Sequence, residues 1–86
     1  MKIYLRKFGI VLTSRPAGKE AFAAARPILD PNAKKVEVDF SGIISLSPSW
    51  ADEFFRALEG MYGDKVIYLP SDNPSVNATL RIIHDK

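Results

Sequence analysis

Cysteine is absent from the sequence. Its absence excludes a disulfide-bonded scaffold, a thiolate zinc site and a cysteine nucleophile. Long apolar runs are missing too, since no stretch approaches the roughly 20 apolar residues that cross a bilayer. At the start, Arg6 and Lys7 interrupt the chain before a secretory signal could form. We therefore expect a cytoplasmic protein with no membrane segment.

Histidine and net charge are also scarce. The chain carries a formal net charge of +2 and a single histidine, His84. A lone histidine beside Asp85 is typical of a surface position near a helix end, and a general base needs an orienting partner and a pocket. Glycine-rich phosphate-binding motifs and paired metal ligands are missing as well. The sequence therefore gives no reason to expect an enzyme, a cofactor or a metal ion.

The sequence does contain patterns of apolar residues that are typical of β-strands. Its 86 residues, 47% of them hydrophobic, fit a single domain over residues 1–86 with one small core. Residues 36–40 alternate between apolar and acidic side chains, which predicts a strand with one buried face. Residues 2–13 predict a hairpin of two short apolar strands that turns at Gly9. A nearly continuous apolar run over residues 65–69 predicts a strand at an inner position of the sheet.

Helical spacing follows three of these strands. We expect the first helix to begin at Thr13 or Ser14 and to end near Pro27, and the last to begin at Asn73 and Pro74. The apolar stripe of the middle helix consists of Trp50, Ala51, Phe54, Phe55 and Leu58. The element order is then β-β-α-β-α-β-α. It predicts an α/β fold with a mixed sheet of about four strands and about three helices.

Ser47 and Ser49 are alternative N-caps of the middle helix. Ser47 precedes Pro48, which a first helical turn tolerates, whereas Ser49 has Asp52 three residues later, a variant of the capping box. Either choice places a hydroxyl among free backbone N–H groups at the positive end of a helix dipole. That environment favours a bound or covalent phosphate. Capping alone is nevertheless the commonest role of serine at a helix start.

The segment VEVDFSGIISLSPSWADEFFRAL, residues 36–58, resembles the STAS domain, the fold of sulfate transporters and anti-sigma-factor antagonists. It is similar in detail to the STAS-like family of unknown function. In that family a strand ends in Asp-Phe, a glycine follows, and Ser-x-Ser-Phe-Ala-Asp-Glu begins the next helix. The rest of the chain matches by pattern, with residues 3–13 resembling the opening hairpin and residues 66–83 the last strand and helix. The resemblance implies an α/β fold of the STAS-like type.

The resemblance also implies a function and a site. In anti-sigma-factor antagonists, an Asp-Ser-Ser-Gly-like motif begins the middle helix, and a partner kinase phosphorylates its second serine. Counted from Asp39, the motif falls on residues 47–50, and Ser49 keeps the phosphoacceptor position. The implied function is regulatory protein binding, with a partner that resembles an ATPase-fold serine kinase or an anti-sigma factor. The implied partner-binding residues are Asp39, Ser41, Ser47, Trp50, Asp52 and Glu53.

Two alternatives remain open. In the first, Trp50 anchors a constitutive adaptor interface without phosphorylation, as aromatic anchors often do. In the second, basic residues that precede the first acidic residue form an edge that binds nucleic acid. These residues are Lys2, Arg6, Lys7, Arg15 and Lys19. Few aromatic side chains stand among them for base stacking, so we do not expect nucleic acid as the partner.

Overall fold

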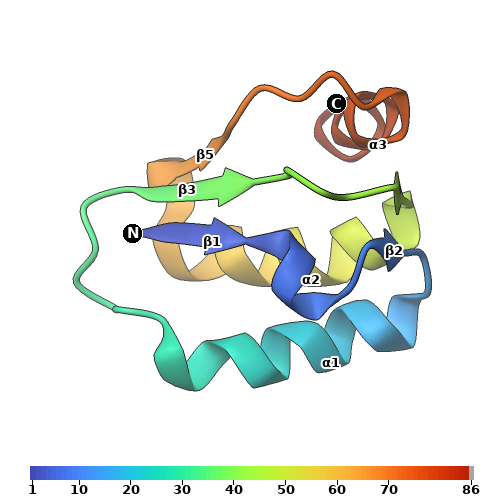
Figure 1. Ribbon diagram of the computed structural model, residues 1–86. Coiled ribbons are helices and arrows are strands. Elements are labelled where there is room, and N and C mark those ends of the chain that lie inside the picture. The colour runs from blue at the N-terminus through green and yellow to red at the C-terminus, as the bar shows by residue number, and fades with distance from the viewer. Residues whose placement is uncertain (86) are drawn as a thin grey trace.

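The central strand of the fold is the one that the sequence indicates most clearly. In the computed structural model, which describes residues 1–85, β3 (Val36–Asp39) lies between β1 (Lys2–Tyr4) and β5 (Val66–Tyr68) in a parallel sheet, as Figure 1 shows. Ile3 pairs with Val38, and the Val38 side chain is completely buried. The alternating pattern of β3 thus places its apolar face against the core, as predicted.

The predicted hairpin over residues 2–13 is wrong. A 3-10 turn, η1 (Leu5–Phe8), follows β1 and buries Leu5, and Gly9 then adopts a φ of 127° that L side chains rarely adopt. The second apolar run becomes β2 (Val11–Leu12), which pairs in parallel with β4 (Ser45–Leu46) in a separate sheet. Within residues 1–85 every strand pair is therefore parallel, and five strands in two sheets replace the expected mixed sheet of four.

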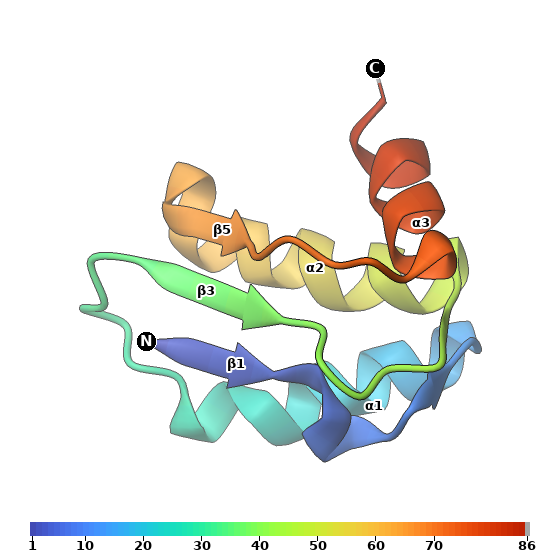
Figure 2. The same cartoon turned by 45° about the horizontal axis from the view of Figure 1, so that its top comes forward.

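The predicted inner position of the strand at residues 65–69 is also wrong. β5 lies at an edge of the three-stranded sheet. Only part of its run of apolar residues is buried: Val66 and Tyr68 pack on the core, whereas Ile67 remains 42% exposed. Figures 1 and 2 place no helix of the described residues 1–85 over the face of the sheet that lies opposite α1 and α2.

Three helices begin where the sequence predicts. α1 (Arg15–Ala25) and α2 (Pro48–Tyr62) cover one face of the three-stranded sheet, and α3 (Pro74–His84) lies beyond the carboxyl ends of its strands (Figure 2). Ser14 caps α1 by accepting a hydrogen bond from the Ala17 N–H at 3.2 Å. No helix within residues 1–85 combines the length and the apolar character that crossing a bilayer requires.

The aromatic face of α2 forms the centre of the core. All five residues of the predicted stripe are buried: Trp50, Ala51, Phe54, Phe55 and Leu58. The Trp50 and Phe54 rings are stacked with centroids 4.9 Å apart. α1 approaches this region closely at Gly18, where a Cβ atom would lie 2.6 Å from the Trp50 carbonyl oxygen. Only glycine leaves room for the two helices at this crossing.

α3 is attached through the second sheet. The Leu46 N–H donates a hydrogen bond to the Ser75 hydroxyl at 2.9 Å, and the Leu46 carbonyl accepts one from the buried Thr79 hydroxyl at 2.7 Å. Val76 is completely buried, whereas Leu80 and Ile83, four and seven residues later on the same face of α3, are half-buried. Because β4 directly precedes α2, these bonds fix α3 near the start of that helix.

Candidate functional site

Ser47 is the residue that caps α2. Its hydroxyl accepts a hydrogen bond from the Trp50 N–H at 3.3 Å and donates one to the Thr13 carbonyl at 2.5 Å. Its own N–H donates to the Leu12 carbonyl at 2.9 Å. Of the two predicted alternatives, Ser47 is therefore the N-cap, and its hydrogen bonds connect β2 to α2. Ser49 lies in the first turn of the helix.

Ser49 is half-exposed and lies in a hollow between the three helices. We call this the Ser49 hollow; its volume is about 240 Å³, and it is lined by Arg15, Pro48, Ser49, Asp52, Arg56, Ile82, Ile83 and Asp85. Within residues 1–85 the Ser49 hydroxyl makes no hydrogen bond to another group of the protein. It therefore remains chemically available, at the positive end of the α2 dipole.

Two guanidinium groups of the Ser49 hollow are paired with acidic residues of α2. Arg15 Nη1 lies 3.0 Å from Asp52 Oδ2 and 2.8 Å from Glu53 Oε2, and Arg56 Nε contacts the other oxygen of Asp52. Hydrogen bonds from Arg56 and from Arg15 hold the pKa of Asp52 below its usual value. Adjacent helical side chains diverge, yet the long Arg15 side chain reaches both carboxylates and joins α1 to α2.

Asp39 and Ser41 lie elsewhere, at the carboxyl end of β3. Asp39 Oδ1 accepts hydrogen bonds from the Ser41 N–H at 2.7 Å and the Ser41 hydroxyl at 2.5 Å, and these bonds lower the pKa of Asp39. Both residues line a separate hollow with residues 69–72. The chain between them and α2 passes through β4. Of the partner-binding residues expected on one surface, Asp39 and Ser41 therefore line one hollow and Asp52 lines the other.

Trp50 cannot be the exposed anchor of a partner interface. Its side chain is only 1% exposed, stacked on Phe54 and packed edge-on against Phe55. Trp50 is the third residue of α2, and the helix turns that position toward α1 and the core. The prediction of an accessible indole is therefore wrong, and the indole contributes to stability instead.

An exposed aliphatic patch replaces it beside the start of α2. Ile10, Val11 and Ile44 are 48%, 57% and 63% exposed, and we call these three residues the aliphatic patch. They lie close together, since Ile44, which precedes β4, donates its N–H to the Ile10 carbonyl at 2.8 Å, and Val11 belongs to β2, which pairs with β4. Sequence reasoning assigned Ile10 and Val11 to a strand without asking which side chains would remain outside, and it placed Ile44 in no strand. Clustered exposed apolar side chains are typical of interaction surfaces.

A second polar cluster lies toward the far end of α2. The Glu59 carboxylate accepts a hydrogen bond from the Tyr68 hydroxyl, and its Oε2 atom lies 2.8 Å from His84 Nε2. Burial, and then the bond to Glu59, raise the pKa of Tyr68. His84 therefore has a partner that the sequence did not indicate, and it links the end of α3 to α2. Within residues 1–85 no three acidic or histidine side chains form a metal-binding group.

The basic residues of the amino-terminal segment do not form one uniform edge. Arg15 is paired with α2, Lys2 lies 3.8 Å from Asp39, and Arg6 donates a hydrogen bond to the Ser41 hydroxyl at 3.0 Å. These neighbours reduce the attraction that the same charges would exert on a polyanion. The arrangement gives no support to a phosphate-backbone surface.

Comparison with known protein families places the chain in one of them. Residues 23–77 match the family described as a STAS-like domain of unknown function (DUF4325). The match covers more than half of the chain, so the protein belongs to this family. The matched range includes β3, the Ser-Pro-Ser segment and all of α2, and it confirms the resemblance stated from the sequence. No curated protein and no solved structure matched the chain.

Proposed function

We propose that this STAS-like domain is a regulatory protein-binding module that resembles an anti-sigma-factor antagonist. The observation that carries the proposal is the aliphatic patch beside the start of α2. Ile10, Val11 and Ile44 remain outside although the chain buries a well-packed aromatic core. Apolar side chains gathered on a small surface favour contact with another protein. The first turn of α2 would lie at the border of that contact.

Ser49 supplies the regulation in this proposal. A phosphate there adds about −1.5 to −2 charge at neutral pH. Its position in the first turn of α2 favours a negative charge, and Arg15 and Arg56 line the same hollow. Asp52 already holds both guanidinium groups, so the phosphate would compete for them. Phosphorylation would then change the charge beside the aliphatic patch without unfolding the domain.

The partner follows from the family resemblance. An anti-sigma-factor antagonist binds a protein that resembles an ATPase-fold serine kinase or an anti-sigma factor, and such a kinase would also phosphorylate Ser49. The role proposed here is binding in the cytoplasm, with no catalytic step and no cofactor. Asp39 and Ser41 would contact the partner through their own hollow at the end of β3, if the interface extends that far.

The test begins with the complex from the native host. The tagged protein is recovered with its partner, and the intact mass of the domain is measured for an added phosphate. Affinity is then measured by calorimetry for Ile44→Asp, with Ile67→Asp as the matched control, because Ile67 is 42% exposed on β5 and does not line the Ser49 hollow. We expect Ile44→Asp to weaken the complex at least tenfold and the control to bind normally. Normal binding by Ile44→Asp contradicts the proposed interface.

Ser49→Asp and Ser49→Ala separate a switch from a constitutive adaptor. With a switch, Ser49→Asp weakens the complex and Ser49→Ala does not, because only the first adds charge beside Asp52. If both variants bind normally while Ile44→Asp does not, the domain is an adaptor without phosphorylation. That alternative is favoured by the patch itself, which needs no modification to be exposed.

A further inference from the structure

The outer edge of β1 carries backbone groups without partners. Glu37 donates its N–H to the Met1 carbonyl at 2.8 Å, and the parallel register pairs Lys2 with Glu37 and Tyr4 with Asp39. Alternate residues of a parallel strand direct their backbone groups to opposite sides. The backbone groups of Ile3 therefore face β3, whereas the N–H groups of Lys2 and Tyr4 face away from it. β1 is an edge strand, so within residues 1–85 no strand pairs with this side.

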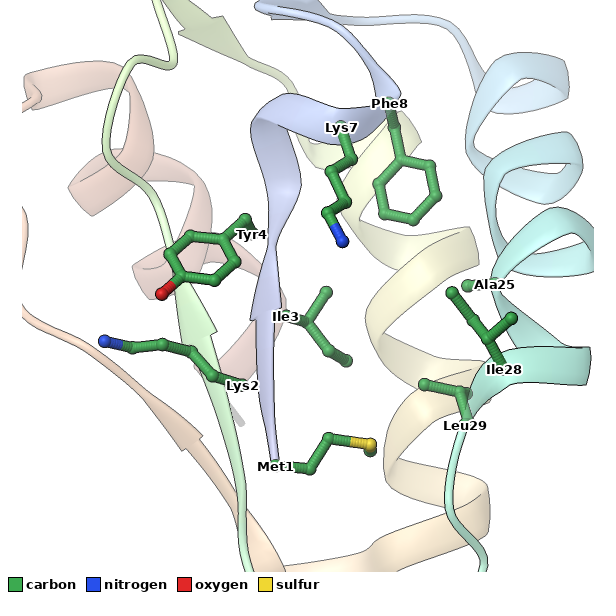
Figure 3. Close-up of a pocket in the computed structure, with 9 residues that line it drawn as sticks. All are labelled: Met1, Lys2, Ile3, Tyr4, Lys7, Phe8, Ala25, Ile28 and Leu29. Atoms are coloured by element: carbon green, nitrogen blue, oxygen red, sulfur yellow. The ribbon is translucent and has the colours of Figure 1, made fainter.

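A cavity lies along this open edge. It has a volume of about 210 Å³ and is lined by Met1, Lys2, Ile3, Tyr4, Lys7, Phe8, Ala25, Ile28 and Leu29. We call it the β1 hollow. Figure 3 shows Ile3 pointing from β1 toward Ile28 and Leu29, while Tyr4 and Lys2 point to the other face. Ile28 is 74% exposed. An extended chain placed beside β1 would thus find an apolar recess on one side.

The charged residues that line the β1 hollow are both lysines, Lys2 and Lys7. Arg6 does not line it and instead donates a hydrogen bond to the Ser41 hydroxyl. Lys7 makes no ion pair within residues 1–85, and its side chain extends over the hollow in Figure 3. Asp39 lies 3.8 Å from Lys2 Nζ and offsets part of its charge, so Lys7 is the lysine of the hollow without an acidic partner in the described residues. A ligand of opposite charge is therefore favoured here.

We propose that the outer edge of β1 binds an extended acidic segment of a partner protein by strand addition. Backbone hydrogen bonds to Lys2 and Tyr4 align the segment as a new edge strand. Its side chains then alternate between the two faces of the sheet. Apolar residues on one face enter the β1 hollow against Ile3 and Ile28, beside Lys7, and acidic residues on the other face reach the ammonium group of Lys2.

A second copy of this chain is not the occupant that the charges favour. Edge-to-edge pairing of two β1 strands would bring the basic residues of both copies together, and like charges across paired strands are destabilising. The proposed surface is also separate from the one beside α2, which lies on β2 and β4. The inference therefore stands or falls independently of the proposed function.

The experiment uses an acetylated and amidated hexapeptide of alternating glutamate and valine. We expect titration into the ¹⁵N-labelled protein to shift the amide signals of Lys2 and Tyr4. Two further peptides are N-methylated at every valine or at every glutamate. One of them loses the N–H groups that face β1 and should not bind, whereas the other loses only those facing solvent and should bind normally. Equal binding by both N-methylated peptides, or no binding by the unmodified one, overturns the proposal.

Two pairs of variants test the surface from the side of the protein. Tyr4→Pro removes an outward N–H without breaking the bonds to β3, and we expect it to bind the peptide about three- to tenfold more weakly than Tyr4→Ala. Lys7→Glu should weaken peptide binding about fivefold. Lys19→Glu, at an exposed position of α1, is its control and should bind the peptide normally. Circular dichroism verifies that each variant is folded. If both pairs bind alike, strand addition at β1 is excluded.

Discussion

The two faces of α2 have opposite physical roles. Its inner face carries Trp50 and Phe54, which are completely enclosed, while its outer face carries Asp52 and Arg56 in contact with solvent. Burial of an aromatic side chain removes a large apolar area from water, whereas an exposed ion pair is screened and contributes little. The comparison shows that the inner face of α2 contributes most of its stabilising contacts, whereas the outer face determines the charge at the surface. Changes to the outer face can therefore regulate binding without unfolding the protein.

Truncation of the inner face should have the largest effect. Trp50→Ala removes a ring that stacks on Phe54, so we expect the free energy of unfolding to fall by about 3–5 kcal/mol. Urea denaturation followed by circular dichroism measures the change. Arg56→Ala, on the outer face of the same helix, is the control and should cost less than about 1 kcal/mol. Equal losses for the two variants would show that the faces do not differ as described.

The close contact between α1 and α2 should have an intermediate effect. Gly18→Ala places a methyl group 2.6 Å from the Trp50 carbonyl oxygen, and forcing the helices apart should cost about 1–3 kcal/mol. Gly60→Ala is the matched control, because a Cβ there meets nothing within 4 Å. The control should instead stabilise α2 by about 0.5–1 kcal/mol. Thermal unfolding of both variants checks the signs, and stabilisation by Gly18→Ala would contradict the tight crossing.

The ion pairs of the outer face should have the smallest effect, and it should depend on pH. Arg56 and Arg15 lower the pKa of Asp52 in the folded protein. The pairing therefore stabilises the fold above the unfolded pKa of this carboxyl group, and the stabilisation is lost as pH falls through the folded pKa. The side chain is 27% exposed, so we expect less than about 1 kcal/mol.

Urea unfolding at about pH 7 and about pH 3 measures this contribution. Asp52→Asn should lower stability at the higher pH and bring it closer to the wild-type value at the lower pH. Asp64→Asn is the control, because Asp64 is exposed and makes no ion pair within residues 1–85. An unchanged pH dependence in Asp52→Asn would exclude a role for the pairing.

Helix positions could be predicted from the sequence because their signals are local. The starts of α1 and α3, at Ser14 and Asn73, follow from a capping side chain with a proline one or two residues later. The stripe of α2 follows from helical periodicity, and the strand at β3 from simple alternation. The family resemblance covered the same segment, so the fold class and the central region of the candidate site were found together.

Strand partners and exposure could not be predicted, because they depend on contacts between distant residues. The apolar run at residues 10–12 fits a hairpin as well as it fits β2, and only its pairing with β4 decides the matter. The network at Arg15 joins residues 37 and 38 positions apart. Trp50 shows the same limit, since a tryptophan at a helix start can face either a partner or the core.

The parallel register of β1 has a consequence for the order of events in folding. Lys2 pairs with Glu37, 35 residues later, so β1 cannot gain its hydrogen bonds from any neighbouring segment. During synthesis at about 5–20 residues per second, the first strand therefore waits roughly 2–7 seconds for β3 to be made. Throughout that interval β1 lacks its strand partner, and the long separation of the paired residues in the sequence slows assembly of the sheet.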